Sequence, residues 1–218
     1  MPAEVVETGA LRAVVRFAYH YNQSDVVQDM IVYRDSRRID FKSEVEWQED
    51  HRLLKTYFPV NVRSTKASYD IQFGHVERTT NFNTSWDMAR FEVAAHKWAD
   101  FSETGYGVAL MNDCKYGYSI KDHVMKLSLL KSAKHPDTQA DMGHHSFTYS
   151  LLPHKGSLQE GRVIEESTAL NQPLECRGGN SVICGRQIFT CNTNAVQMDV
   201  VKPAEDGRGL ILRIHECH

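Results

Sequence analysis

The sequence lacks a long apolar run, an excess of one charge and a recognisable signal peptide. No window approaches the ~18 consecutive apolar residues that a membrane span requires. The first ten residues, MPAEVVETGA, do not follow the basic and then apolar pattern of a secretory signal. The 25 Lys and Arg residues nearly balance the 28 Asp and Glu residues, so the chain as a whole does not attract a polyanion. We therefore expect a cytoplasmic protein that binds neither nucleic acid nor a membrane.

Paired cysteine motifs and the common catalytic loops are also missing. The five cysteines form an odd set without a C-x-x-C pair, which argues against a disulfide framework and a thiolate zinc knuckle. Free thiols are therefore expected. No G-x-S-x-G elbow, P-loop or dinucleotide fingerprint occurs, and the glycine-containing segment 177–180 is interpreted as a surface loop. The cysteines are Cys114, Cys176, Cys184, Cys191 and Cys217.

Short segments in which apolar and polar residues alternate are abundant. In residues 38–47, Ile39, Phe41, Val45 and Trp47 alternate with charged residues, as in a half-buried antiparallel strand. Further strands are expected at 11–21, 26–33, 69–76, 90–95, 107–111, 124–130, 146–151, 196–201 and 210–215, and one helix at 158–170. Many strands with little helix predict a mainly β fold, an antiparallel sandwich or barrel with at most one or two short helices.

Domain organisation is predicted from the length of the chain and from its ends. All-β chains of 218 residues are often single domains, so residues 1–10 are interpreted as an N-terminal tail and residues 11–218 as one β-sandwich domain. Residues 209–218 resemble a strand with no turn or polar tail after it. An unpaired terminal strand would expose an apolar edge. We therefore expect a domain truncated at its C-terminus, whose free edge would favour a homo-oligomer.

Two patterns that could carry chemistry are interpreted as polar surface. Asp141, His144 and His145 lie within five positions, but adjacent strand residues point to opposite faces and no further ligand follows at a typical spacing, so no metal ligand is assigned. Glycoside hydrolysis needs a pair of carboxylates, yet alternation exposes most acidic residues, and no catalytic residue is assigned. The acidic residues considered are Asp87, Glu92, Asp100, Glu103 and Asp113.

The segment 72–118 is dense in aromatic, basic and amide side chains. Aromatic rings cover the apolar face of a sugar, while amides and cations bind its hydroxyl groups, so this segment points to a carbohydrate protein. Arg78 and Trp86 are interpreted as substrate-binding residues. Trp98, Phe91 and Phe101 are expected to pack in the core.

An ordered series of motifs resembles one known family. The chain is similar, from about residue 25 to its end, to the C-terminal region of glycoside hydrolase family 38, the retaining α-mannosidases, and within it to the cytosolic and bacterial branch. Several motifs in order are more specific than any one alone. They are SRRIDF (36–41), VEW (45–47), FPV (58–60), IQFG (71–74), NTSW (83–86), RFEV (90–93), HKWAD (96–100), GYGVAL (105–110), NDCKYG (112–117), FTY (147–149) and PHKG (153–156).

The resemblance implies an antiparallel β-supersandwich resembling the galactose mutarotase-like fold. In the family, the zinc ion, the nucleophile and the acid/base residue belong to an N-terminal catalytic barrel, joined through a helical bundle to the sandwich. The resemblance therefore implies a non-catalytic part of an intact enzyme that hydrolyses terminal α-linked mannose. No cofactor is expected on this chain. Its partners would be the barrel and bundle of the same polypeptide, and a mannoside substrate.

The resemblance also implies that loops of the sandwich reach toward the barrel. The segment 131–144 is interpreted as one such loop, in which Lys134, Asp137, Asp141 and His144 would contact the substrate or the barrel. Two other functions stay open. One is an autonomous carbohydrate-binding module, and the other is a mutarotase-like sugar enzyme, because a related sandwich hosts that chemistry; fold analogy alone does not transfer function.

Overall fold

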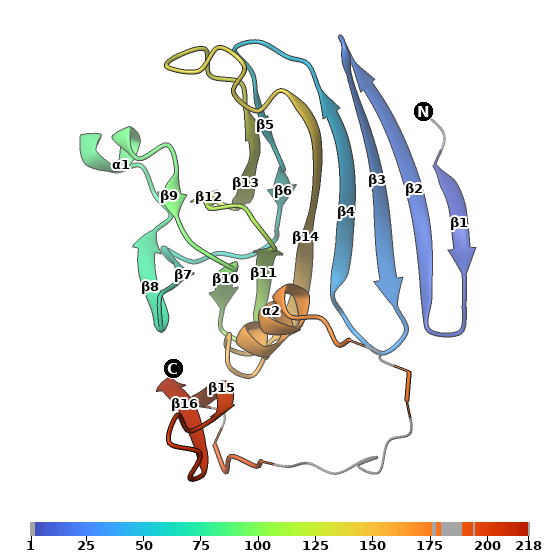
Figure 1. Ribbon diagram of the computed structural model, residues 1–218. Helices are drawn as coiled ribbons and strands as arrows, with labels where there is room; N and C mark the ends of the chain where they lie inside the picture. The colour runs from blue at the N-terminus through green and yellow to red at the C-terminus, as the bar shows by residue number, and fades with distance from the viewer. Residues whose placement is uncertain (1–2, 176–177, 180–188, 194, 218) are drawn as a thin grey trace.

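The computed structural model describes residues 3–175, 178–179, 189–193 and 195–217. These residues form sixteen strands and two short helices (Figure 1). The strands are β1 Glu4–Thr8, β2 Arg12–Tyr21, β3 Ser24–Tyr33, β4 Ile39–Trp47, β5 Leu53–Lys55, β6 Phe58–Pro59, β7 Lys66–Ile71, β8 Gly74–Thr79, β9 Val93–Ala94, β10 Trp98–Glu103, β11 Tyr106–Asn112, β12 Gly117–Lys121, β13 Val124–Lys131, β14 Gly143–Lys155, β15 Val196–Pro203 and β16 Leu210–Glu216; the helices are α1 Ser85–Ala89 and α2 Val163–Asn171.

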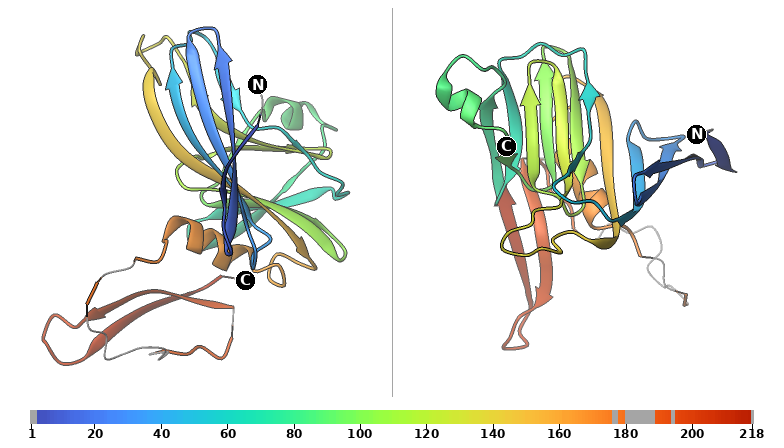
Figure 2. Two further views of the ribbon diagram at one scale, coloured as in Figure 1. Left: turned by 90° about the vertical axis from the view of Figure 1, so that its right-hand side faces the viewer. Right: turned by 90° about the horizontal axis from the view of Figure 1, so that it is seen from above.

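Antiparallel pairing organises these strands into a sandwich. Nine strands form the large sheet in the order β1-β2-β3-β4-β14-β11-β10-β7-β8, and a second sheet has the order β5-β13-β12-β9, with β6 beside β13. The hairpin β15–β16 forms a separate two-stranded sheet. The views of Figure 2 show that the first strands of the large sheet project beyond the second sheet. The mainly β, antiparallel fold with two short helices is confirmed.

The main core lies between the two sheets. Tyr69, Phe101 and Leu110 of the large sheet pack against Tyr118 and Leu127 of the second sheet, and all five are buried. Burial of this much apolar surface is the main stabilising contribution to the fold. The predicted alternation of 38–47 is confirmed, because Phe41, Val45 and Trp47 pack in this core.

A second core lies on the opposite face of the large sheet, under α2. Trp98 of β10 and Met111 of β11 pack there with Val163 of α2. Strand β11 is therefore buried on both faces, which explains why its sequence, YGVALMN, is almost continuously apolar. The helix is tied to the sheet by the side chain of Asn171, which donates to the backbone oxygen of Asn112 at 3.0 Å.

Next to this second core, a histidine is enclosed by two glycines. His154 Nε2 lies 2.8 Å from Asp100 Oδ1, and both side chains are buried. A Cβ atom on Gly107 or on Gly161 would overlap the imidazole ring. Glycine is therefore required at both positions by the close approach of the backbone to the ring.

Three expected elements differ in the structure. The strand predicted over 69–76 is a hairpin, β7–β8, whose turn contains Phe73 at φ 57°. Of the residues 90–95, where a strand was predicted, only Val93–Ala94 form one in the structure, β9. The helix predicted over 158–170 begins at Val163, because the preceding residues form turns and Arg162 adopts a left-handed conformation.

Six other segments also form structure that was not expected, and four of them are the strands β5, β6, β10 and β12. Residues Glu4–Thr8, within the predicted N-terminal tail, form β1 and pair with β2. Ser85–Ala89, where no helix was expected, form the short helix α1. Cys114 and Cys191 are free thiols, as predicted. Cys176, Cys184 and two of the four residues of the loop interpreted over 177–180 lie outside the described residues.

Candidate functional sites

The loop that joins β13 to β14, residues 132–142, is held by its own side chains. Lys134 Nζ donates to the backbone oxygen of Thr138 at 2.6 Å and forms an ion pair with Asp50. Asp137 Oδ1 accepts a hydrogen bond from the Gln139 backbone at 2.8 Å. The polar groups of this loop therefore fix its shape.

Asp141 and His144 lie where the loop enters β14 but do not converge. Asp141, at φ 57°, accepts the Lys131 backbone N–H at 2.6 Å. His144 lies on the outer face of the large sheet, with Nδ1 2.7 Å from Glu46 Oε1 and Nε2 3.2 Å from Glu44 Oε2. Across residues 3–175 and the other described segments, no group of three His, Cys, Asp or Glu side chains is placed to hold a metal ion.

Arg78 lies on β8, and Trp86 lies on the short helix α1. The Arg78 guanidinium lies 4.8 Å from the centroid of the Tyr69 ring, and its Nη1 is buried without a hydrogen-bond partner. Burial lowers the pKa of Arg78. Trp86 is 76% exposed on α1. Phe91 is 82% exposed, so its predicted place in the core is wrong, whereas Trp98 and Phe101 are buried as predicted.

The five acidic residues considered as catalytic candidates in the segment 72–118 have structural roles. Asp87 caps α1 by accepting the backbone N–H and hydroxyl of Thr84, and the hydrogen bond from that hydroxyl is the main reason that the pKa of Asp87 lies below its ordinary value. Glu92 accepts from Lys55 and Ser128. The other three bind backbone or buried groups: Asp100 with His154 and Ser102, Glu103 with the Arg63 N–H, and Asp113 with the Thr148 N–H.

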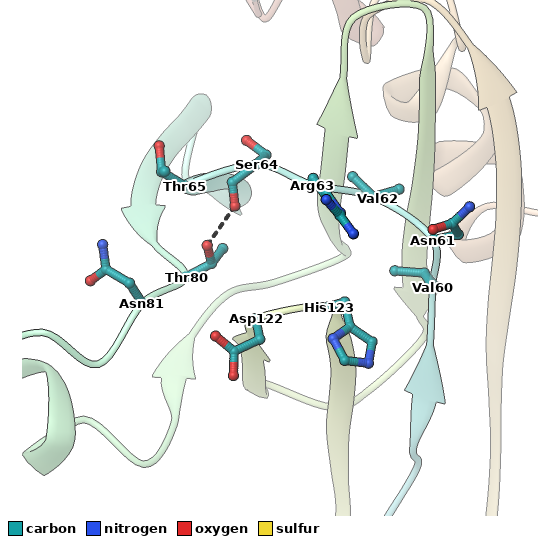
Figure 3. A pocket seen from close by; sticks show the side chains of 10 residues that line it. All are labelled: Val60, Asn61, Val62, Arg63, Ser64, Thr65, Thr80, Asn81, Asp122 and His123. Atoms are coloured by element: carbon teal, nitrogen blue, oxygen red, sulfur yellow. Dashed lines mark hydrogen bonds between the residues drawn. The ribbon is translucent and has the colours of Figure 1, made fainter.

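At the other end of β13 the structure forms a cleft of about 620 Å³, here called the polar cleft (Figure 3). Three separate segments line it: residues 60–65 between β6 and β7, Thr80 and Asn81 after β8, and the β12–β13 turn Asp122–His123. Backbone hydrogen bonds join the segments. Val60 N donates to His123 O at 2.9 Å, Asp122 N to Thr80 O at 2.9 Å, and Thr80 N to Thr65 O at 3.1 Å.

Several side chains of the polar cleft have free polar ends. For Asn61, Arg63, Asn81, Asp122 and His123, the described residues provide no side-chain hydrogen bond or ion pair, although Arg63 and Asp122 use their backbone N–H groups. Figure 3 shows the Arg63 side chain extending from its loop toward the Asp122–His123 turn. Sequence reasoning missed this cleft because its three segments are far apart in the chain and none carries a recognisable motif.

An aromatic groove of about 370 Å³ lies on the inner face of the large sheet, beside β5. Tyr19 and Tyr21 of β2 line it and are about half exposed, together with the buried Trp47 and Tyr149. Arg52 Nε donates to the Tyr21 hydroxyl at 3.3 Å. The groove exists because the second sheet ends at β5 and leaves the inner face of β2 and β3 uncovered.

The structure thus defines a two-sheet β-sandwich domain with surface clefts and, among the described residues, no group of three possible metal ligands. Two solved structures from Enterococcus faecalis share this fold. An α-mannosidase matches with a TM-score of 0.79 at 13% identity, over 97% of this chain and 29% of that chain. A protein in glycosyl hydrolase family 38 matches with a TM-score of 0.76 at 12% identity, over 98% of this chain and 32% of that chain.

Sequence comparisons give the family. Residues 2–139 match the glycosyl hydrolases family 38 C-terminal domain. Alpha-mannosidase G of Dictyostelium discoideum is 44% identical over 98% of this chain and 20% of its own length, and Alpha-mannosidase 2C1 of Homo sapiens is 44% identical over 96% of this chain and 21% of its own length. The chain belongs to glycosyl hydrolase family 38 and contains its C-terminal domain. It spans about a fifth of the length of these relatives.

Proposed function

We propose that this chain is the non-catalytic C-terminal sandwich of an α-mannosidase, and that the intact enzyme hydrolyses terminal α-linked mannose with retention. One observation carries the proposal: in a domain that fills about a fifth of its α-mannosidase relatives, the acidic candidates bind groups within the fold. Asp87 caps a helix, Glu92 pairs with Lys55, and Asp113 accepts a backbone N–H. Carboxylates committed in this way are not poised to attack or protonate a sugar.

The residues described on this chain do not fit a zinc site. They bring no three possible ligands together, and a catalytic zinc ion needs about three protein ligands. In the proposed enzyme, zinc and the catalytic carboxylates would therefore belong to the N-terminal barrel of the same polypeptide. The contribution of the sandwich would be to position loops around the mannoside and to support the barrel.

Exposed apolar surface supports a larger polypeptide as the partner. Tyr19 and Tyr21 are 50% and 48% exposed on the inner face of the large sheet, and on the hairpin Leu210 and Ile214 are 61% and 59% exposed. Contiguous apolar surface usually marks an interaction site. We propose that the helical bundle or the barrel covers the aromatic groove in the intact protein.

The loop 132–142 is proposed to face the mannoside. Its internal hydrogen bonds hold it in one shape, and a preformed loop loses less conformational entropy when a ligand binds. In the intact enzyme, the second carboxylate oxygen of Asp137 and the remaining N–H donor of the Lys134 ammonium would contact the substrate.

A matched pair of aspartates tests the role of the loop. Asp137 and Asp206 each accept the backbone N–H two residues further along, at 2.8 and 2.9 Å, but Asp206 lies in the β15–β16 turn. In the intact protein, Asp137→Ala should lower kcat/KM for an aryl α-mannoside about tenfold, a loss of about 1.4 kcal/mol. Asp206→Ala should leave kcat/KM unchanged. Equal effects of the two substitutions would contradict the proposal.

A second assay tests the non-catalytic role. The 218-residue chain and a version extended upstream to the start of the intact polypeptide are compared for aryl α-mannoside hydrolysis, with circular dichroism to establish that each is folded. Hydrolysis by the extended protein alone is expected. Hydrolysis by the folded 218-residue chain would overturn the proposal.

The cytoplasmic location and the homo-oligomeric assembly of the protein stay predictions. None of the described helices is long and apolar enough to cross a lipid bilayer. Cell fractionation would test the cytoplasmic location, and light scattering of the intact protein would test the predicted homo-oligomer.

A further inference from the structure

The polar cleft has a fixed frame and free side-chain ends. Thr80 is bonded to both of the other segments of the cleft. The Thr80 hydroxyl donates to Ser64 O at 2.7 Å, and the Thr80 backbone oxygen accepts from Asp122 N at 2.9 Å. Val62, between Asn61 and Arg63, is only 1% exposed and anchors the loop in the main core. A frame of this kind fixes the backbone that carries the polar side chains before any ligand arrives, which reduces the backbone entropy lost on binding.

The unengaged groups include both hydrogen-bond donors and acceptors. The amides of Asn61 and Asn81 each offer an oxygen and an NH₂ group, Arg63 offers donors only, and Asp122 offers acceptors only. His123 adds a ring that can donate or accept. A sugar hydroxyl both donates and accepts, so this mixture suits a ligand with several hydroxyl groups.

The charge of the cleft disfavours an anionic ligand. Its lining contains one guanidinium, from Arg63, and one carboxylate, from Asp122. Phosphate and carboxylate sites usually gather cationic donors without a competing carboxylate. The cleft volume of about 620 Å³ falls within the range of small-molecule sites.

The position of the cleft separates it from the proposed substrate loop. The cleft turn precedes Val124 and the loop follows Lys131, so the two lie at opposite ends of β13, which has eight residues. At a rise of about 3.3 Å per residue, roughly 23 Å of strand lies between them. A ligand in the cleft would therefore not be the sugar that is cut beside the loop.

We propose that the polar cleft is a second, non-catalytic site that binds a neutral polyhydroxyl ligand of the sugar class. Arg63, Asn81 and Asp122 bind its hydroxyl groups. The choice of a mannoside as the probe rests on the proposed function, whereas the site itself rests on the side chains of the cleft.

Hydrogen-exchange mass spectrometry of the intact protein tests this site locally. Saturating methyl α-mannoside should slow amide exchange in residues 60–65 and 122–124, because a bound ligand suppresses opening of the frame. Inorganic phosphate at the same concentration should not. Protection of these residues by phosphate and not by the mannoside would overturn the proposal, as would no change with either probe.

Two variants and one matched control assign the effect to the cleft. Arg63→Ala and Asn81→Ala remove exposed or half-exposed side chains and keep the backbone hydrogen bonds of the frame, and each should raise the mannoside concentration that gives half-maximal protection about tenfold. Asn83→Ala, two residues beyond Asn81 and outside the lining, should leave it unchanged. Unaltered protection in both cleft variants would contradict the proposal.

The same preparation separates this inference from the proposed function. Aryl α-mannoside hydrolysis reports on the catalytic proposal, and exchange in residues 60–65 reports on the cleft. Protection without hydrolysis would support the cleft and count against the mannosidase proposal. Hydrolysis without protection of residues 60–65 would support the mannosidase proposal and count against a ligand site in the polar cleft.

Discussion

The two ends of β13 differ in how they use polar side chains. At the loop end, residues 132–142, Lys134 and Asp137 bind partners within the loop, and Asp141 binds the adjoining backbone. At the cleft end, Arg63 and Asn81 have no side-chain partner among the described residues. Groups engaged within the fold maintain a shape, whereas unengaged groups in a rigid frame remain available to a ligand. A polar surface is therefore informative only when the partners of each side chain are known.

The largest expected effect comes from removing the anchor of the loop end. Trp47 is 3% exposed, and its Nε1 donates to Ser132 Oγ at 2.5 Å. Trp47→Ala should lower the free energy of unfolding by about 3–5 kcal/mol, because it leaves a cavity and an unpaired hydroxyl. Urea unfolding measures the loss, and hydrogen exchange should quicken in residues 132–142 more than in residues 60–65.

Trp86→Ala provides the control for this substitution. Trp86 is 76% exposed, so its loss should change the free energy of unfolding by less than about 0.5 kcal/mol. If Trp47→Ala and Trp86→Ala lowered the free energy of unfolding equally, the prediction that the buried tryptophan anchors the loop end would be wrong.

A matched pair of glycine substitutions, one at each end of β13, tests the same comparison. The expected change in the free energy of unfolding is smaller than for Trp47→Ala. Asp141 and Asp122 both adopt left-handed backbone conformations, at φ 57° and 53°, which glycine adopts without strain. Asp141→Gly should cost about 1 kcal/mol, because the Lys131 N–H loses its acceptor. Asp122→Gly removes no side-chain hydrogen bond and should stay within about 0.5 kcal/mol of the unsubstituted protein. Thermal unfolding of both variants tests the difference, and a larger cost for Asp122→Gly would refute it.

The smallest effect concerns an ion pair between the two ends. Burial raises the pKa of Glu92, but hydrogen bonds from Lys55 and Ser128 outweigh it and leave that pKa below its ordinary value. The pair therefore stabilises the fold above the ordinary glutamate pKa of about 4.3, and the stabilisation is lost as the pH falls toward the lower folded value. Glu92→Gln should be less stable than the unsubstituted protein at pH 7, and the difference should shrink at pH 4. A difference that grows in acid would contradict this assignment.

Long alternating segments were predictable from sequence because two-residue periodicity reflects burial on one face. The strand at 38–47 is an example. The hairpin within 69–76 was not predictable in this way, because its turn places Phe73, a residue that rarely adopts a positive φ, at 57°. The exposure of Phe91 was missed because hydrophobicity alone does not show which aromatic residues lie outside a strand.

The candidate sites were less predictable than the fold. The polar cleft joins residues 60–65 to Asp122 and His123 through strand pairing that is not local in sequence. Residues chosen by type, such as Asp141 and His144, proved to be engaged with their neighbours. Composition indicates which chemistry is possible, but only tertiary structure shows which polar groups remain unpaired.

Strand β1, at one of the two edges of the large sheet, is interrupted in a way that affects aggregation. Strand β1 has a bulge between Val5 and Glu7, and Glu7 is paired with Arg12 at 2.9 Å. A bulge bends a strand and breaks its regular row of hydrogen-bonding groups, and a charged edge is a poor template for another chain. Fibril growth by strand addition at β1 is therefore disfavoured. If the inner face of the large sheet is left uncovered during synthesis, aggregation would instead proceed through the exposed aromatic side chains of that face, Tyr19 and Tyr21.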